Sequence, residues 1–165
     1  MRIKVSELYL GFQNKIFEIF SRDLADRGIV YKSGNILAKI SVTKEKNYFY
    51  LNGNLKTTVE HTCVRCLKKN PKRINLPINI LILEETMSFE TRTDHDIMYF
   101  NKSSDSINMK NILADLIALA EPIQPLCNNN CTGLCPMCGT EKTNFCNCDG
   151  HANNYTWDKL KNIKF

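Results

Sequence analysis

The alternation of apolar and polar side chains in the first third of the chain predicts β-strands. Residues 2–10 alternate with an imperfect period of two and are expected to form the first strand. Residues 13–27 fit either one face of a helix or a strand, and the pattern leaves this alternative open. Residues 36–42 and 48–51 predict two strands joined by a polar turn. The pattern therefore favours an antiparallel β-meander.

Two further extended segments lie on either side of the first pair of cysteines. Asn52 to Asn54 predicts a turn, after which residues 55–62 resume a β-branched, extended pattern. Residues 74–83 predict the return strand, in which Pro77 indicates a sheet edge or a bulge because proline has no N–H for the ladder. We expect the cysteine pair to form a metal-binding knuckle at the end of this hairpin.

The second half of the chain predicts loops and one main helix. Residues 84–96 are polar and acidic and predict a loop, followed by a short strand over residues 97–100 and a turn over residues 101–105. A helix is expected over residues 109–121, capped by Asn108 and ended by two prolines. Its apolar stripe is expected to comprise Ile112, Leu116 and Leu119.

These elements together predict an α+β fold, with an antiparallel β-meander or a small barrel-like sheet, one main helix and cysteine-rich knuckles. We expect a single domain over residues 1–165, a length that can bury a substantial core. Its parts are a β-rich core over 1–107 with the first knuckle at 63–66, the helix at 108–121, a cysteine-rich segment at 127–148 and a C-terminal tail at 155–164. The tail fits a short amphipathic helix.

Charge and hydrophobicity narrow the class of protein. The formal net charge of +5 counts every cysteine as a neutral thiol. Two zinc ions held by eight thiolates would lower it to about +1, so global basicity does not indicate nucleic-acid binding. The longest apolar run, residues 112–120, is too short to span a bilayer, and the N-terminus lacks the apolar region of a secretory signal. We expect a cytoplasmic protein that does not enter a membrane.

The eight cysteines carry the clearest chemical signal. They form four close pairs, Cys63-x2-Cys66, Cys127-x3-Cys131, Cys135-x2-Cys138 and Cys146-x-Cys148. Two thiolates on one tight turn can hold a metal ion together, and two such pairs complete a tetrahedral shell. In a reducing compartment, paired cysteines favour metal binding over disulfides. The sequence therefore predicts two all-cysteine metal sites.

Loop lengths suggest how the four pairs combine. Cys135 and Cys138 lie only seven residues before the last pair, so that loop closes at little cost. Gly139 follows the knuckle and tolerates the positive φ that such a turn requires. We expect site 1 to comprise Cys63, Cys66, Cys127 and Cys131, and site 2 to comprise Cys135, Cys138, Cys146 and Cys148. Other pairings stay open, because the last three pairs are close in sequence.

Zinc is the expected metal, with two ions per chain. The alternative is iron, because C-P-x-C-G also occurs in rubredoxin-type sites, but the tight Cys146-x-Cys148 pair does not match the second half of such a site. His61 and His151 lie near the cysteines and are expected to be solvated surface side chains, because the eight thiols already complete two shells.

The ordered cysteine motifs resemble those of the YceD family, which is tied to accumulation of large-subunit ribosomal RNA. The resemblance rests on an extended run into Cys63-Val-Arg-Cys66, a helix that ends in P-x-x-P-L-C at Cys127, the string C-x3-C-x-G-L-C-P-x-C-G up to Gly139, and the closing C-x-C. It implies a role in ribosome biogenesis. It also implies partners such as large-subunit rRNA, a pre-ribosomal particle or a small ribosomal protein.

A local cluster of cations is the candidate nucleic-acid contact. Five basic residues fall within nine positions without an intervening acid: Arg65, Lys68, Lys69, Lys72 and Arg73. Lys56 is expected on the adjoining strand, and among Tyr48, Phe49 and Tyr50 at least two are expected in the core or in cross-strand pairs. The alternative is a solvated, lysine-rich hairpin end.

We therefore expect a non-enzymatic, zinc-stabilised factor. The competing classes are a rubredoxin-like redox protein with iron and a zinc-dependent nucleic-acid enzyme. An enzyme is not expected, because a catalytic zinc keeps an open position and both shells here are closed by sulfur.

Overall fold

The computed structural model describes residues 1–86, 96–142, 146 and 148. The chain divides into two compact units. The sheet unit comprises residues 1–61 and 70–123, and the cysteine unit comprises residues 62–69 with the described part of residues 124–165. The expectation that the chain behaves as a single domain stays a prediction.

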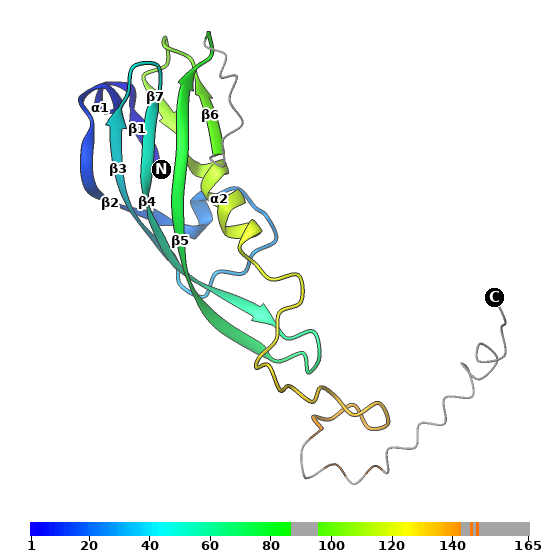
Figure 1. Ribbon diagram of the computed structural model, residues 1–165. Coiled ribbons are helices and arrows are strands. Elements are labelled where there is room, and N and C mark those ends of the chain that lie inside the picture. Colours follow the sequence, from blue (N-terminus) through cyan, green and yellow to red (C-terminus); the bar gives the residue numbers. More distant parts are fainter. Residues whose placement is uncertain (87–95, 143–145, 147, 149–165) are drawn as a thin grey trace, which may run out of the picture. The chain divides into compact units, whose positions relative to one another are not determined.

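The main element of the sheet unit is a mixed five-stranded sheet with the strand order β2-β3-β4-β5-β6 (Figure 1). Its strands are β2 (Phe12–Phe20), β3 (Asn35–Lys44), β4 (Phe49–Thr62), β5 (Lys69–Glu84) and β6 (Asp96–Phe100). The order follows the sequence, as in a meander, and both β2–β3 and β3–β4 are antiparallel. Strand β6 instead pairs parallel with β5, so the sheet is mixed.

Short elements complete the sheet unit. Strands β1 (Arg2–Lys4) and β7 (Ser106–Asn108) form a separate antiparallel pair. The helices are α1 (Val5–Leu10), the 3-10 turn η1 (Ser21–Asp23) and α2 (Lys110–Leu119). The side chain of Asn108 accepts a hydrogen bond from the backbone N–H of Lys110 at 3.1 Å, so it helps to start α2.

The core lies on one face of the five-stranded sheet, where the helices and the β1–β7 pair meet it. Side chains alternate along β3, so that Ile36, Ala38 and Ile40 are fully buried while Leu37 and Lys39 are exposed. The buried residues of β3 join one cluster with residues of both helices, namely Leu8, Leu113, Ala114 and Ile117. The opposite face of β3 therefore points away from this core.

Local packing overrides the predicted first strand. Strand β1 ends at Lys4, and residues 5–10 form α1, which is closed by Gly11 with φ of 68°. The strand predicted for residues 2–10 is therefore wrong beyond Lys4. The physical reason is burial, because the helix places Leu8 in the core and leaves Leu10 86% exposed.

The turn predicted at Asn52 to Asn54 is also wrong, because these residues continue β4. Gly53 lies directly opposite Ile40 in β3. A Cβ at this position would lie 2.1 Å from the backbone oxygen of Lys39. The glycine therefore permits a close approach of two strands and does not mark a turn.

Two further expectations concern Pro77 and the buried face of α2. Strand β6 is in register with β5 only over residues 80–84, so Pro77 lies before this paired stretch, and its assignment to a sheet edge or a bulge stays a prediction. The fully buried residues of α2 are Leu113, Ala114 and Ile117. Of the predicted stripe, Ile112 and Leu116 are half-buried and pack against the core, whereas Leu119 is 82% exposed. The buried face of α2 differs from the predicted one because tertiary contacts, and not the helical period alone, decide which side chains are buried.

The remaining element predictions agree with the structure or fall outside it. The strands predicted at 36–42, 74–83 and 97–100 are confirmed, and the open alternative in residues 13–27 resolves to β2 followed by η1. The helix predicted at 109–121 is confirmed as α2. The predicted tail helix at 155–164 and most of the predicted loop at 84–96 lie outside the described residues. Among the described residues, no helix is long and apolar enough to cross a membrane.

Candidate metal centres

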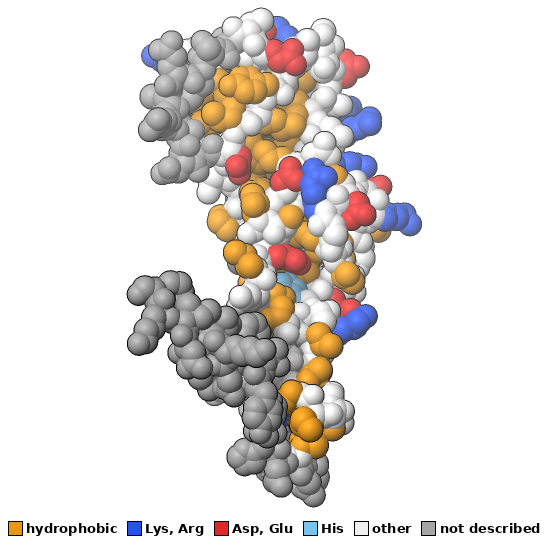
Figure 2. Space-filling view, turned by 90° about the vertical axis from the view of Figure 1, so that its right-hand side faces the viewer, with side chains coloured by type: hydrophobic (Ala, Val, Ile, Leu, Met, Phe, Trp, Pro, Cys, Tyr) orange, Lys and Arg blue, Asp and Glu red, His pale blue; other side chains and the backbone are white. Residues whose placement is uncertain are grey.

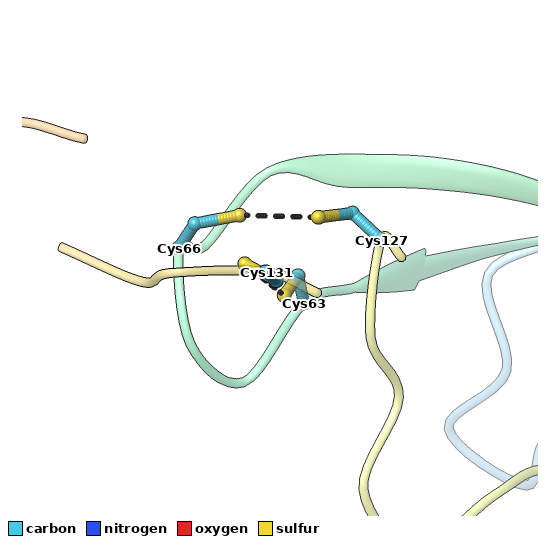
Figure 3. Close-up of side chains that lie close together, drawn as sticks. All are labelled: Cys63, Cys66, Cys127 and Cys131. Atoms are coloured by element: carbon cyan, nitrogen blue, oxygen red, sulfur yellow. Dashed lines mark hydrogen bonds between the residues drawn. The ribbon is translucent and has the colours of Figure 1, made fainter. Parts of the chain in front are cut away.

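Site 1 is a compact group of four thiols in the cysteine unit (Figure 3). The four sulfur atoms lie within 4.8 Å of one another and belong to Cys63, Cys66, Cys127 and Cys131. The Cys63–Cys131 and Cys66–Cys127 pairs have Sγ–Sγ distances of 3.8 and 3.6 Å. A tetrahedral zinc ion with bonds of about 2.3 Å would hold its sulfurs about 3.8 Å apart. The group therefore fits a four-sulfur metal shell.

Site 2 repeats this arrangement with the other four cysteines. The sulfurs of Cys135, Cys138, Cys146 and Cys148 also lie within 4.8 Å of one another, and the Cys138–Cys146 pair is 3.6 Å apart. All eight cysteines are free of disulfides. Three members of site 1 are buried, whereas Cys138 and Cys148 of site 2 are exposed. The structure thus groups the cysteines in the two sets expected from the loop lengths; their role as metal ligands stays a prediction.

The two knuckles have the same backbone turn. In the first knuckle, the N–H of Cys63 donates to the carbonyl of Lys68 and the N–H of Leu67 donates to the carbonyl of Cys63, both at 2.9 Å. The second knuckle repeats these bonds from Cys135 to Thr140 at 2.7 Å and from Gly139 to Cys135 at 2.8 Å. The turn therefore depends on the spacing of the cysteines and tolerates different intervening residues.

The residue after each knuckle adopts a left-handed backbone conformation. Gly139 has φ of 69°, as expected from its place in the sequence, and Leu67 has φ of 59° at the equivalent position. A side chain in this region costs about 1–2 kcal/mol, and the Leu67 side chain is 63% exposed. Sequence reasoning missed Leu67, although its position after C-x-x-C is the signal that would have identified it.

Arg65 connects the first knuckle to the loop that carries Cys131. Its guanidinium donates to the carbonyl of Cys131 at 2.9 Å, and its own carbonyl accepts a bond from the N–H of Leu134 at 3.1 Å. Gly133 lies beside it with φ of 78°, and a Cβ there would be 3.2 Å from the Arg65 carbonyl oxygen. A small residue with left-handed geometry is therefore needed where the two segments meet.

Hydrogen bonds to the sulfurs divide the thiols of each site into strong and weak acids. Burial acts to raise the pKa of Cys63, but backbone N–H groups of Cys66, Cys127 and Arg65 lower it to about 6. The neighbouring sulfurs of Cys131 and Cys66 raise the pKa of Cys127 to about 12. Without a metal, the four thiols of site 1 therefore share protons, because adjacent thiolates repel one another.

Site 2 shows the same division. Thr140 lowers the pKa of Cys138 to about 6, through its hydroxyl and its backbone N–H. The sulfurs of Cys138, Cys146 and Cys135 raise the pKa of Cys148 to about 12. A dication would stabilise all four thiolates together and displace the remaining protons. The donor set is uniformly sulfur, which suits zinc or iron.

The structure divides the predicted basic cluster between the two units. Arg65, Lys68 and Lys69 belong to the cysteine unit, and Lys72 and Arg73 belong to the sheet unit. Lys68 pairs with Glu141 at 2.6 Å, and this carboxylate raises the Lys68 pKa. Arg65 and Lys68 thus take part in contacts within their own unit. The nucleic-acid role of the cluster stays a prediction.

Two expectations about individual side chains can be compared with the structure. His61 is not a solvated surface residue, because it is only 8% exposed and its Nε2 lies 3.5 Å from a carboxylate oxygen of Glu121. His151 lies outside the described residues. Phe49 lies in the core and contacts Tyr9 with ring centroids 5.0 Å apart, as expected for at least part of the aromatic run.

The two four-cysteine groups, each built on a C-x-x-C knuckle with the same backbone turn, define a class of protein with paired cysteine clusters that could each hold a metal ion. The family model described as "Large ribosomal RNA subunit accumulation protein YceD" matches residues 51–164 and includes both groups. The chain belongs to this family.

Curated relatives are distant and longer. The chain is 24% identical over 141 residues to the "Large ribosomal RNA subunit accumulation protein YCED homolog 1, chloroplastic" of Zea mays, covering 68% of this chain and 48% of that protein. It is 27% identical over 77 residues to an uncharacterized protein of Mycobacterium tuberculosis (strain ATCC 25618 / H37Rv), covering 47% of this chain and 37% of that protein. The chain therefore spans about half or less of these relatives. No solved structure matches it.

Proposed function

We propose that this protein is a zinc-stabilised, non-enzymatic factor that supports the accumulation of large-subunit ribosomal RNA by binding that RNA. The observation that carries the proposal is the pair of four-cysteine groups, each within 4.8 Å, inside the region that matches the YceD family. The name of the maize relative supports the connection with large-subunit rRNA.

Zinc is proposed in preference to iron. Sulfur separations of 3.6 to 3.8 Å suit either ion, so the choice rests on the ligand spacing. A rubredoxin-type iron site uses two knuckles of the same two-residue spacing, whereas site 2 ends in the tighter Cys146-x-Cys148 pair. A structural role for zinc also agrees with three buried sulfurs in site 1.

A binding role is proposed in preference to catalysis. A catalytic zinc ion keeps one position open for water or substrate. In each group four sulfurs lie within 4.8 Å of one another, so a tetrahedral ion bound by all four has no ligand position left. We place the protein in a reducing compartment such as the cytoplasm, where paired cysteines more often bind metal than form disulfides.

The proposal is tested in cells depleted of the protein and complemented with chosen variants. We expect depletion to lower the ratio of large-subunit to small-subunit rRNA, and the parent chain or a Lys46→Gln control to restore it. Cys66→Ser, which breaks site 1, should fail to restore it. An unchanged ratio on depletion would reject the proposed function.

Crosslinking of the parent protein to RNA then distinguishes the direct mechanism from an indirect one. Ultraviolet crosslinking followed by sequencing should recover large-subunit rRNA from the complemented cells. If the rRNA ratio depends on the protein but only a ribosomal protein is crosslinked, direct RNA binding is wrong and the protein partner carries the function.

A further inference from the structure

The face of the sheet opposite the core is open across β2, β3 and β4. Glu18, Leu37 and Lys56 lie directly opposite one another in three neighbouring strands, and all three side chains are exposed. A second row places Ile16 beside Lys39, and Ile16 is 65% exposed. These side chains share one face because directly paired residues point to the same side of a sheet.

The open face contains a pocket of about 630 Å³. This volume is within the range of small-molecule sites and is sufficient for one nucleotide. Residues of β2, β3, β4 and β5 and of the loop before β3 line the pocket, and its polar and charged side chains include Asn35, Lys56, Arg73 and Asn75.

Charge at the pocket favours a polyanion. Lys56 and Arg73 line it, and Glu18 is the one carboxylate among the described residues that does so. Lys39 extends the cationic surface, since it is adjacent to Leu37 and Lys56 in the same sheet face. Where Figure 2 shows the sheet unit, acidic and basic side chains are instead interspersed. The cations around the pocket can therefore contact successive phosphates.

An exposed aromatic ring lies beside the pocket. Phe20 is 48% exposed and lies opposite Asn35, which lines the pocket. The guanidinium of Arg22 lies 4.9 Å from the centroid of the Phe20 ring. Rings and guanidinium planes stack on unpaired bases, and amides such as those of Asn35 and Asn75 can pair with base edges.

We propose that this open sheet face binds an unpaired stretch of RNA, with one nucleotide in the pocket and its neighbours stacked towards Phe20. The ligand is single-stranded because a flat face with an exposed ring can contact splayed bases, which a duplex hides. The inference rests on the proposed function and adds a contact surface distinct from the knuckle cations Arg65, Lys68 and Lys69.

The test is fluorescence anisotropy with the zinc-loaded parent protein and a labelled single-stranded 12-nucleotide RNA of mixed sequence. In the face variant, Lys39→Gln and Lys56→Gln are combined; the charge-matched control combines Lys4→Gln and Lys46→Gln at exposed positions elsewhere. We expect the face variant to flatten the salt dependence of binding by about 1.4 units in log–log slope, since each lost phosphate contact removes about 0.7. The control should leave the slope unchanged.

A stacking variant tests the aromatic part separately. Phe20→Leu keeps most of the apolar side chain but removes the ring, and we expect it to weaken binding at least about fivefold with little change in salt slope. Circular dichroism melts and zinc content of each variant show whether the fold is intact. If Phe20→Leu loses both RNA binding and its fold, Phe20→Tyr is measured instead. This variant keeps an aromatic ring, so it should bind RNA as tightly as the parent.

The outcomes separate this inference from the proposed function. If the parent binds RNA and the Lys69→Gln/Lys72→Gln variant weakens binding while the face and stacking variants do not, the sheet-face inference is wrong and RNA binding stands. If the face and stacking variants weaken binding, the inference is supported. If the parent binds no RNA but binds an acidic ribosomal protein through Lys39 and Lys56, both RNA proposals are rejected.

Discussion

Replacing Cys66 by serine is expected to destabilise the protein more than replacing Cys146, although each change removes one sulfur from one metal site. The difference comes from the separation of the ligands along the chain. In site 1, the neighbouring sulfurs of Cys66 and Cys127 are 61 positions apart, whereas those of Cys138 and Cys146 in site 2 are 8 positions apart.

The magnitude follows from loop closure in the unfolded chain. Its cost grows as (3/2)RT times the logarithm of loop length, so site 1 costs about 1.8 kcal/mol more to close than site 2. Site 2 can therefore retain metal in the unfolded chain more readily. Metal that binds both states does not stabilise the folded one, whereas metal at site 1 binds the folded state selectively. Loss of site 1 should thus lower the free energy of unfolding by about 1.8 kcal/mol more.

Urea unfolding of the zinc-loaded, reduced variants measures this difference. With a denaturant slope of about 1–3 kcal/mol/M, the midpoint of Cys66→Ser should lie about 0.6–1.8 M below that of Cys146→Ser. Cys127→Ser and Cys148→Ser provide independent repeats for the two sites, and each variant should retain one zinc ion. Equal midpoints, or a lower midpoint for Cys146→Ser, would refute the argument from loop length.

The purified protein should contain two zinc ions per chain by elemental analysis; one ion, none, or a red iron-containing sample would contradict the assignment. A chelator should remove the ion of site 2 first, because Cys138 and Cys148 are exposed while three sulfurs of site 1 are buried; removal followed in Cys66→Ser and Cys146→Ser identifies which ion leaves. Gly53→Ala should cost about 2–3 kcal/mol in a thermal melt, because its Cβ would lie 2.1 Å from the Lys39 oxygen. Gly34→Ala is the matched control, since nothing lies within 4 Å of the added atom, and an equal cost for both would show that strand approach is not the cause. Neutralising Lys69 and Lys72 together should flatten the salt dependence of RNA binding by up to about 1.4 units, and an unchanged slope would leave these lysines as a solvated rim.

Local chemistry was predictable from the sequence, because it depends on residues close together in the chain. The spacing of the cysteines gave the two sets that the structure brings together, and Gly139 identified the left-handed end of the second knuckle. The strand over residues 36–42 was predictable because its alternation matches a half-buried sheet.

Features set by distant parts of the chain were not predictable in the same way. Gly53 resembles a turn residue until its partner Ile40 in the neighbouring strand β3 is known. Residues 5–10 have no strong local preference, and burial of Leu8 decides for a helix. The pocket on the open sheet face is lined by residues from four strands and the loop before β3, so no single segment of the sequence predicts it.

The long separation between the two halves of site 1 has a consequence for synthesis. Cys63 and Cys66 leave the ribosome well before Cys127 and Cys131, because β5, β6, β7 and α2 are encoded between them. At about 5–20 residues per second, this interval lasts about 3–12 s. During that time only two of the four sulfurs of site 1, those of Cys63 and Cys66, are available to a metal ion. Site 1 can therefore bind a metal ion with all four sulfurs only after all five strands of the sheet and helix α2 have been synthesised.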